Sequence, residues 1–191
     1  MNKIKVKIEV SAKHLHISRE DLDVLFGKDY ELKKKKDLSQ TGEFASEEKV
    51  DLINGDKKLE GIRIVGPIRK KTQIELAITD AIKLGIKPPL RISGNTENSE
   101  TVKVVGPKGT LELKEGVIIA KRHLHISTAE AENYGLKNNQ VVKLKILGER
   151  KLVFDEIVVR IADNYKFMIH LDTDEANAAH ISNMDEGEII I

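Results

Sequence analysis

The 191-residue sequence contains no cysteine and no tryptophan, and aromatic residues make up only 4% of it. The absence of cysteine excludes disulfides, thiolate zinc sites and a cysteine nucleophile. The scarcity of aromatic side chains argues against a surface that stacks nucleic-acid bases. Metal binding or nucleophilic attack must therefore use other groups.

An excess of charge of one sign is also lacking, because 32 basic and 31 acidic residues leave a net charge of +1. This balance gives neither a nucleic-acid footprint nor a polybasic membrane arm, so any anionic ligand must be captured locally. The N-terminal MNKIKVKIEV alternates lysine with isoleucine or valine and has no apolar run long enough for a signal peptide or a membrane span. We expect a cytoplasmic protein with no nucleic-acid or membrane partner.

One motif, His-Leu-His-Ile-Ser, occurs twice and carries four of the six histidines: His14 and His16, then His123 and His125. On a strand, residues two apart share one face, so both imidazoles of a pair can converge on one metal ion. On a helix they would point apart. Two identical units favour metal binding over the ordinary alternative of surface or core histidines, since histidine is the commonest metal ligand.

Each histidine pair is followed by the signals of a short helix. The capping-box pairs and the glycines that end the helices are Ser18 with Asp21 and Gly27, and Ser127 with Glu130 and Gly135. The repeat of strand end, histidine pair, helix and glycine favours two consecutive domains of about 90 residues each.

The rest of the chain consists of short alternating segments separated by turn signals. Residues 3–10 predict a half-buried strand, and Asn54-Gly55 predicts a hairpin turn. Residues 72–77 predict another strand, followed by a short helix with Thr79 as N-cap and Gly85 as its end. The pattern is typical of a mainly β protein of the barrel or sandwich type with a few short helices.

A catalytic zinc usually has three protein ligands and an open position, so each histidine pair needs a third ligand. His170 in YKFMIHLD and Glu75 in TQIELAI are polar groups in otherwise apolar strands, which is unfavourable unless they are paired or bind a metal. A partnership of Glu75 with a nearby lysine or arginine is an equal alternative. His180 lacks a strand context and is expected to be an ordinary surface histidine.

Arg69 follows the Gly66-Pro67 turn and suits a bidentate grip on phosphate or carboxylate, although a solvated basic cluster is an open alternative. The acidic residues Asp172, Asp174 and Glu175 follow His170 and could support a metal ligand, but capping of the next helix is favoured.

These motifs together resemble the PduL-type phosphotransacylases, a family of phosphate propanoyltransferases and phosphate acetyltransferases. The resemblance rests on SAKHLHIS, GPIRKKTQIE, TDA-x-x-LGI-x-x-P-x-R-x-SG, AKRHLHIS and HLDTDEANAA, which cover nearly the whole chain in order. It implies an acyltransferase that interconverts acyl-CoA plus phosphate and acyl phosphate plus CoA. It also implies a homodimer, and two β-barrels capped by short helices with the active site between them.

The resemblance further implies two zinc ions per chain and a set of substrate contacts. One zinc, next to the CoA sulfur, would be held by His14, His16 and Glu75, and the other by His123, His125 and His170. Arg69 would bind phosphate. The positions associated with CoA contacts are Ser11, Lys36, Arg63 and Asn177.

The resemblance also bears on the domain boundaries and on the N-terminal segment. It implies interleaved domains, with residues 3–12 and 121–191 forming one barrel and residues 13–120 the other. Family members of bacterial microcompartments carry an additional amphipathic N-terminal segment, whereas only a strand's length precedes the first histidine pair here. We therefore expect a free cytoplasmic enzyme that acts on acetyl-CoA in acetate metabolism.

Without cysteine, direct attack of phosphate on the thioester is the simplest mechanism, although serine and carboxylate nucleophiles are not excluded. Two alternatives share the predicted ligands. A dizinc hydrolase would cleave an ester or thioester without phosphate, and a non-catalytic zinc-binding module would have closed coordination and no turnover.

Overall fold

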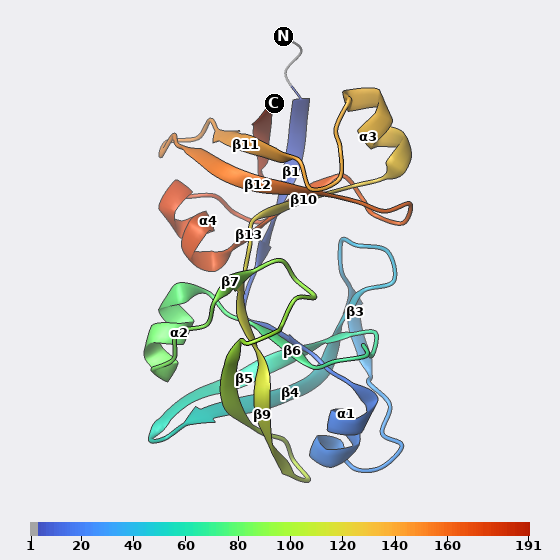
Figure 1. Ribbon diagram of the computed structural model, residues 1–191, viewed down its shortest axis with the longest axis vertical. Coiled ribbons are helices and arrows are strands. Elements are labelled where there is room, and N and C mark those ends of the chain that lie inside the picture. The colour runs from blue at the N-terminus through green and yellow to red at the C-terminus, as the bar shows by residue number, and fades with distance from the viewer. Residues whose placement is uncertain (1–3) are drawn as a thin grey trace. The chain divides into compact units, whose positions relative to one another are not determined.

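The computed structural model describes residues 4–191, which divide into two compact units. We call the first the C-terminal barrel; it holds residues 4–12, Ser39–Thr41 and Lys121–Ile191. The second, the N-terminal barrel, holds Lys13–Leu38 and Gly42–Ala120. Figure 1 shows the strands and helices of each unit.

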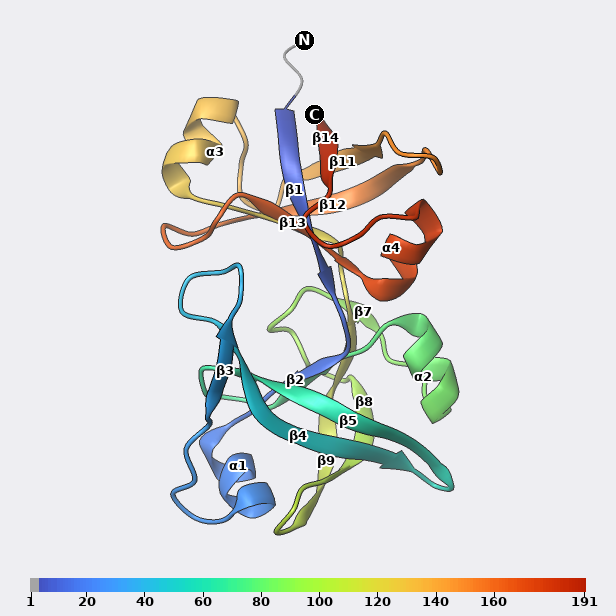
Figure 2. The ribbon, with the colours of Figure 1, turned by 180° about the vertical axis from the view of Figure 1, so that it is seen from behind.

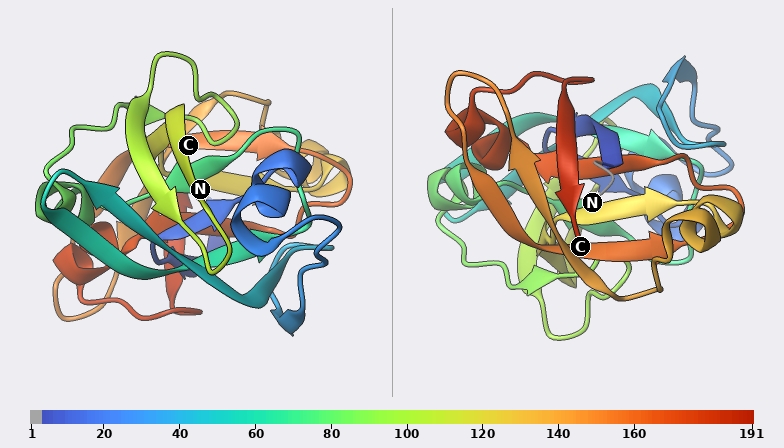
Figure 3. Two further views of the ribbon diagram at one scale, coloured as in Figure 1. Left: turned by 90° about the horizontal axis from the view of Figure 1, so that it is seen from below. Right: turned by 90° about the horizontal axis from the view of Figure 1, so that it is seen from above.

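The C-terminal barrel is a closed ring of six strands in the order β1-β13-β10-β12-β11-β14 (Figure 3). The ring closes because the last strand pairs antiparallel with the first. Its elements are β1 (Ile4–Ser11), β10 (His123–Ile126), α3 (Thr128–Tyr134), β11 (Val141–Ile146), β12 (Val153–Ile161), β13 (Met168–Asp172), α4 (Thr173–Ala179) and β14 (Glu186–Ile190).

The N-terminal barrel is also a ring of six strands, in the order β4-β5-β2-β6-β9-β8, because β8 pairs with both β9 and β4. Strand β3 pairs with β4 and strand β7 with β9, beside the ring. Helix α1 packs against β9, and α2 packs against β5 (Figure 2). The elements are β2 (His14–His16), α1 (Arg19–Phe26), β3 (Lys34–Asp37), β4 (Phe44–Asn54), β5 (Lys57–Gly66), β6 (Gln73–Glu75), α2 (Ile78–Leu84), β7 (Leu90–Arg91), β8 (Glu100–Val105) and β9 (Thr110–Ala120).

The mainly β fold class with two barrels and short helices, expected from the sequence, is thereby confirmed. None of the helices between residues 4 and 191 is long and apolar enough to cross a membrane.

The two rings have the same strand order and the same pair orientations. Strand β2 is parallel to β5 and antiparallel to β6, just as β10 is parallel to β12 and antiparallel to β13. Strand β9 occupies in the N-terminal ring the place that β1 occupies in the C-terminal ring. Each is parallel to the strand that carries the expected third ligand, which is β6 for β9 and β13 for β1. Because β1 leads into β2, and β9 leads into β10, each repeat contributes its first strand to the ring of the other repeat.

Each barrel has its own apolar core. In the C-terminal barrel, Val6 and Ile8 of β1 are buried, as the alternation of residues 3–10 predicts, and pack with Leu124 and Ile169. In the N-terminal barrel the core includes Leu15 of β2 together with residues of α1, α2 and the long strands β4, β5 and β9.

The helix signals give two outcomes. Ser127 and Glu130 form the complete capping box, whereas Ser18 accepts from the backbone N–H of Asp21 at 3.2 Å without the reciprocal bond. The hydroxyl of Thr72 replaces the missing bond between Ser18 and Asp21. It accepts from the N–H of Ser18 at 3.0 Å and donates to the Asp21 carboxylate.

The predicted helix ends are confirmed at Gly85 and Gly135, which are left-handed, with φ of 74° and 66°. Helix α1 also ends at the predicted glycine, but Gly27 has φ 105° and ψ 156°, so the left-handed conformation predicted there is wrong. The prediction of Thr79 as an N-cap is also wrong, because α2 begins at Ile78 and its N-cap, Ala77, offers no side-chain hydrogen bond.

The assignment of β1 to the C-terminal ring can be tested by replacing Ile8, which is fully buried, with alanine. Such a cavity costs about 2–5 kcal/mol, so amides of β13 and β14 should exchange faster with deuterium while those of β4 and β5 keep their protection. Lys5→Ala, an exposed position on the same strand, is the matched control. Faster exchange confined to β4 and β5 would contradict the assignment.

Candidate metal centres

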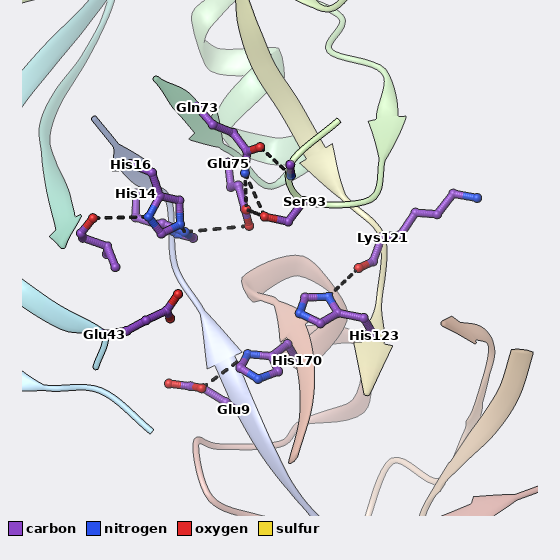
Figure 4. Close-up of polar contacts among 12 residues, drawn as sticks. Glu9, His14, His16, Glu43, Gln73, Glu75, Ser93, Lys121, His123 and His170 are labelled. Atoms are coloured by element: carbon purple, nitrogen blue, oxygen red, sulfur yellow. Dashed lines mark hydrogen bonds and ion pairs between the residues drawn. The ribbon is translucent and has the colours of Figure 1, made fainter. Parts of the chain in front are cut away.

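The first cluster lies on β2 of the N-terminal barrel. The side chain of Leu15 is fully buried in the core, so its neighbours His14 and His16 share the opposite face of the strand. Their Nε2 atoms are 3.2 Å apart. Strand β6 places Glu75 directly opposite His14, and the Glu75 Oε2 atom lies 3.7 Å from the His14 Nε2 atom (Figure 4).

The second cluster is built in the same way in the C-terminal barrel. Strand β13 places His170 opposite His123, at the position that Glu75 has opposite His14 in the other ring. The ring centroids of His123, His125 and His170 lie 4.6 to 4.8 Å from one another. The Nδ1–H of His123 donates to the carbonyl oxygen of Lys121 at 2.8 Å, which leaves Nε2 as its lone-pair nitrogen (Figure 4).

Both clusters fit a divalent metal ion. In each, one ligand atom from all three residues lies within 4.8 Å of the others. Bonds of about 2.0–2.1 Å at tetrahedral angles hold zinc ligands about 3.3 Å apart, and the spacings of 3.2 and 3.7 Å around His14 match this value. Three protein ligands also leave a coordination position open, as in catalytic rather than structural zinc sites.

The environment of His16 keeps its imidazole neutral, as a metal ligand must be. Burial, followed by the charges of His14 and Arg69, lowers the pKa of His16 to about 3. The Nδ1–H donates to the carbonyl oxygen of Val65 at 3.2 Å, so the lone pair of Nε2 points to the side of His14.

Glu75 is oriented by two residues that the sequence did not single out. The side chains of Gln73 and Ser93 each donate to its Oε1 atom at 2.7 Å, and the Oε2 atom faces His14. Gln73 is itself fixed, because its Oε1 accepts from the N–H of Gly94 at 2.7 Å. Both residues lie in motifs that carried the family resemblance, TQIE and RISG, but an isolated glutamine or serine gives no signal of its own.

Two further neighbours support the three-histidine cluster. Glu9 lies opposite His170 in the pairing of β1 with β13, and its Oε2 atom is 3.3 Å from the His170 Nδ1 atom. A carboxylate on the far nitrogen of a ligating histidine is the usual outer support of a metal site. The ring of Tyr165 stacks on His125 with centroids 3.9 Å apart. In the sequence, Glu9 reads only as the polar face of a strand.

An ion pair lies at an equivalent position in each barrel, next to the histidine pair. Lys13 directly precedes the first histidine pair and binds Asp80 at 2.9 Å; Arg122 directly precedes the second and binds Glu175 at 2.7 Å. Asp80 and Glu175 are both the third residue of the helix that follows the third-ligand strand. Burial outweighs the opposing effects of the backbone hydrogen bond from Asp172 and of the Arg122 charge, and raises the pKa of Glu175 to about 7. Each histidine strand is thus tied to the helix behind its third ligand.

The acidic residues after His170 cap helix α4, as favoured from the sequence. Asp172 is the N-cap, its carboxylate accepting from the N–H of Glu175 at 2.9 Å, and Glu175 completes the capping box. His180 ends the same helix, and its side chain is exposed, as expected.

Arg69 lies in the N-terminal barrel and is partly buried, in contrast to the exposed Lys70 and Lys71. Its backbone N–H donates to the carbonyl oxygen of Ile17, and its guanidinium binds Glu43 at 2.9 Å. Because its charge depresses the pKa of His16, it lies within electrostatic reach of the first cluster.

The residues associated with CoA fall two in each barrel, and their role stays a prediction. Ser11 ends β1, and Asn177 is exposed on α4. Lys36 is exposed on β3, while the guanidinium of Arg63 donates to the carbonyl oxygen of Ser46 at 2.5 Å.

The depressed pKa of His16 gives a test on the metal-free protein. The unfolded chain binds a proton at a pKa near 6.5 and the folded chain only near 3, so stability falls as pH drops from 6.5 towards 3. Between pH 7 and pH 5 this amounts to about 2 kcal/mol, which denaturant unfolding in EDTA would measure. His16→Asn should lose that part of the slope, while His180→Asn should keep it. If the wild type and both variants lose the same free energy of unfolding between pH 7 and pH 5, the pKa of His16 is not depressed.

Comparison with known proteins places the chain in a family. The family model described as "Phosphate propanoyltransferase" matches residues 7–182. The chain is 48% identical to the phosphate propanoyltransferase of Priestia megaterium over 95% of this chain and 84% of that relative. It is 44% identical to that of Thermotoga maritima, over 93% and 85% respectively. It is 47% identical to the phosphate propanoyltransferase of Lachnoclostridium phytofermentans, over 93% of this chain and 83% of that relative. The chain therefore belongs to the phosphate propanoyltransferase family.

Proposed function

We propose that this protein is a phosphotransacylase that interconverts acyl-CoA plus phosphate and acyl phosphate plus CoA. The observation that carries the proposal is the pair of equivalent three-residue clusters, His14–His16–Glu75 and His123–His125–His170, each of which would leave one position of a tetrahedral ion open. The names of the relatives give the reaction class, and acetyl-CoA and propanoyl-CoA are the two substrates to compare.

Zinc in the two clusters would supply Lewis-acid stabilisation of negative charge, on the CoA sulfur at the first and on phosphate oxygen at the second. The residues of the chain prepare both clusters for this. His16 is neutral, Glu75 is held by Gln73 and Ser93 with one oxygen directed to His14, and His123 is fixed in the tautomer that presents Nε2.

We assign phosphate binding to Arg69. Its guanidinium is partly buried and already aligned by Glu43, so little side-chain freedom is lost when it binds an anion. In the reaction, a phosphate oxygen attacks the thioester carbonyl carbon, a C–O bond forms, and the C–S bond breaks with its electron pair leaving on sulfur. Direct attack is consistent with the absence of cysteine, and holding two reactants together supplies several kcal/mol of the acceleration.

The finer parts of the proposal are the CoA contacts of Ser11, Lys36, Arg63 and Asn177 and a homodimeric state. They rest on the family resemblance and can be checked by the CoA affinity of alanine variants and by sedimentation.

The reaction is tested by measuring thiol release from acetyl-CoA and propanoyl-CoA by the zinc-loaded protein, with and without phosphate. Every thiol detected comes from CoA, because the chain has no cysteine. We expect release only with phosphate, and the ratio of rates gives the acyl preference. Release that ignores phosphate would identify a thioester hydrolase, and no release would identify a zinc-binding module; either result refutes the proposal.

Arg69→Ala should reduce kcat/KM for phosphate by about 10²–10³-fold, because a charged donor to the reacting group is lost. Its zinc content, measured by atomic emission, should stay that of the wild type, since Arg69 is in neither ligand set. Lys71→Ala, two residues away and exposed, is the matched control. Full activity of the Arg69 variant would remove its phosphate role.

The wild-type protein should bind two zinc ions per chain, and His14→Ala and His123→Ala should each bind one, since each removes a ligand from one cluster. His180→Ala controls for loss of a histidine outside both clusters and should still bind two. A stoichiometry of two in either ligand variant would show that the affected cluster is not a zinc site.

A further inference from the structure

A three-residue segment of the chain belongs to a different barrel from its neighbours in sequence. Ser39–Thr41 connects β3 to β4, both strands of the N-terminal barrel, yet it groups with the C-terminal barrel. There it contributes two polar side chains, those of Ser39 and Gln40, to the surroundings of the three-histidine cluster.

Gln40 is buried, with only 4% of its surface exposed, and its amide is fixed by the backbone of Lys166. The Gln40 Oε1 accepts from the N–H of Lys166 at 3.1 Å, and Nε2 donates to the carbonyl oxygen of Lys166 at 3.3 Å. This pair of bonds determines which end of the amide is the donor. It also holds the backbone next to Tyr165, whose ring stacks on His125.

The same amide nitrogen faces a metal-ligating histidine. The Gln40 Nε2 atom lies 3.3 Å from the His170 Nε2 atom. On the other edge of that ring, Nδ1 faces Glu9 at 3.3 Å, and Glu9 accepts a hydrogen bond from the hydroxyl of Ser39. His170 is therefore held in one tautomer, with the hydrogen on Nδ1 towards the carboxylate and the lone pair on Nε2.

The N-terminal barrel offers a parallel. There a glutamine and a serine, Gln73 and Ser93, orient the third ligand, Glu75. In the C-terminal barrel, a serine again stands behind the third ligand, because Ser39 donates to Glu9 on the Nδ1 side of His170, whereas Gln40 lies on the Nε2 side of the ring.

We propose that Ser39 and Gln40 are positioning residues of the three-histidine site and not metal ligands. Ser39 acts through Glu9 on the Nδ1 side of His170, and Gln40 acts through the Lys166 backbone next to Tyr165. The inference rests on the proposed function in one respect, namely that this cluster binds a metal. Loss of such outer contacts lowers metal affinity by about 10–100-fold in other metalloproteins.

The test uses a His14→Ala/His16→Ala parent, in which only the three-histidine cluster remains intact. Gln40→Met keeps the length and burial of the side chain but removes its hydrogen bonds, and Ser39→Ala removes the support of Glu9. Thr41→Ala, an exposed position of the same segment, is the matched control. The readouts are the Zn²⁺ affinity, by competition with a chromogenic chelator, and the visible absorption spectrum of the Co²⁺-loaded protein.

We expect Gln40→Met to bind Zn²⁺ about 10–100-fold more weakly than the parent and to change the Co²⁺ bands, because the Lys166 backbone loses both bonds to the Gln40 amide and the orientation of Tyr165 and His125 changes. Ser39→Ala should weaken binding in the same direction, and Thr41→Ala should match the parent. If Gln40→Met and Ser39→Ala match Thr41→Ala in both affinity and spectrum, the inference is wrong.

A second parent, His123→Ala/His125→Ala, separates local positioning from general destabilisation. In it only the His14–His16–Glu75 cluster remains, and Gln40→Met should leave its Zn²⁺ affinity unchanged; an equal loss at both clusters would show a purely structural role and overturn the inference. If Gln40→Met does not fold, Ser39→Ala decides by the same criteria. A first parent that binds no Zn²⁺ would refute the metal site of the proposed function as well, whereas a normal parent with unaffected variants would refute this inference alone.

Discussion

Both candidate metal sites depend on one pairing, in which a short histidine strand lies antiparallel to the strand of its third ligand. The pairing of β2 with β6 sets Glu75 opposite His14, and the pairing of β10 with β13 sets His170 opposite His123. The alternation of β2 and β10 buries one leucine in the core, Leu15 or Leu124, between the two histidines that it directs to the cluster. Core packing therefore fixes the position of the ligands before any metal binds.

Support for the ligands comes from several levels of the fold. An ion pair ties the residue before each histidine pair to the helix behind the third ligand, and hydrogen bonds from Gln73 and Ser93 fix Glu75. A ligand held in one rotamer and one tautomer loses little freedom when a metal binds, which is the physical meaning of a prepared site. The same barrel built twice thus provides two related but chemically different candidate centres, one with a carboxylate and one with histidine only.

The sequence predicted the local features well because they depend on residues close together in the chain. The His-x-His spacing, the capping box at Ser127 and the glycine ends of two helices are examples. Contacts between distant residues could not be predicted in this way. Thr72 replaces half of a capping box 54 residues away, and Gln40 lies 126 residues from Lys166. Alternation likewise shows that residues 4–11 form a strand, but it does not show which ring that strand joins.

The exchange of first strands has a consequence for synthesis on the ribosome. The N-terminal ring needs nothing beyond β9, so it can close when residue 120 has emerged. Strand β1 is made first, but its partners are β13 and β14, which are made last. It therefore stays unpaired until β13 and β14 have been made, and the C-terminal ring closes across a loop that contains the whole N-terminal ring. The charged lysines that alternate along this strand are the kind of residue that protects such an edge from pairing with other chains.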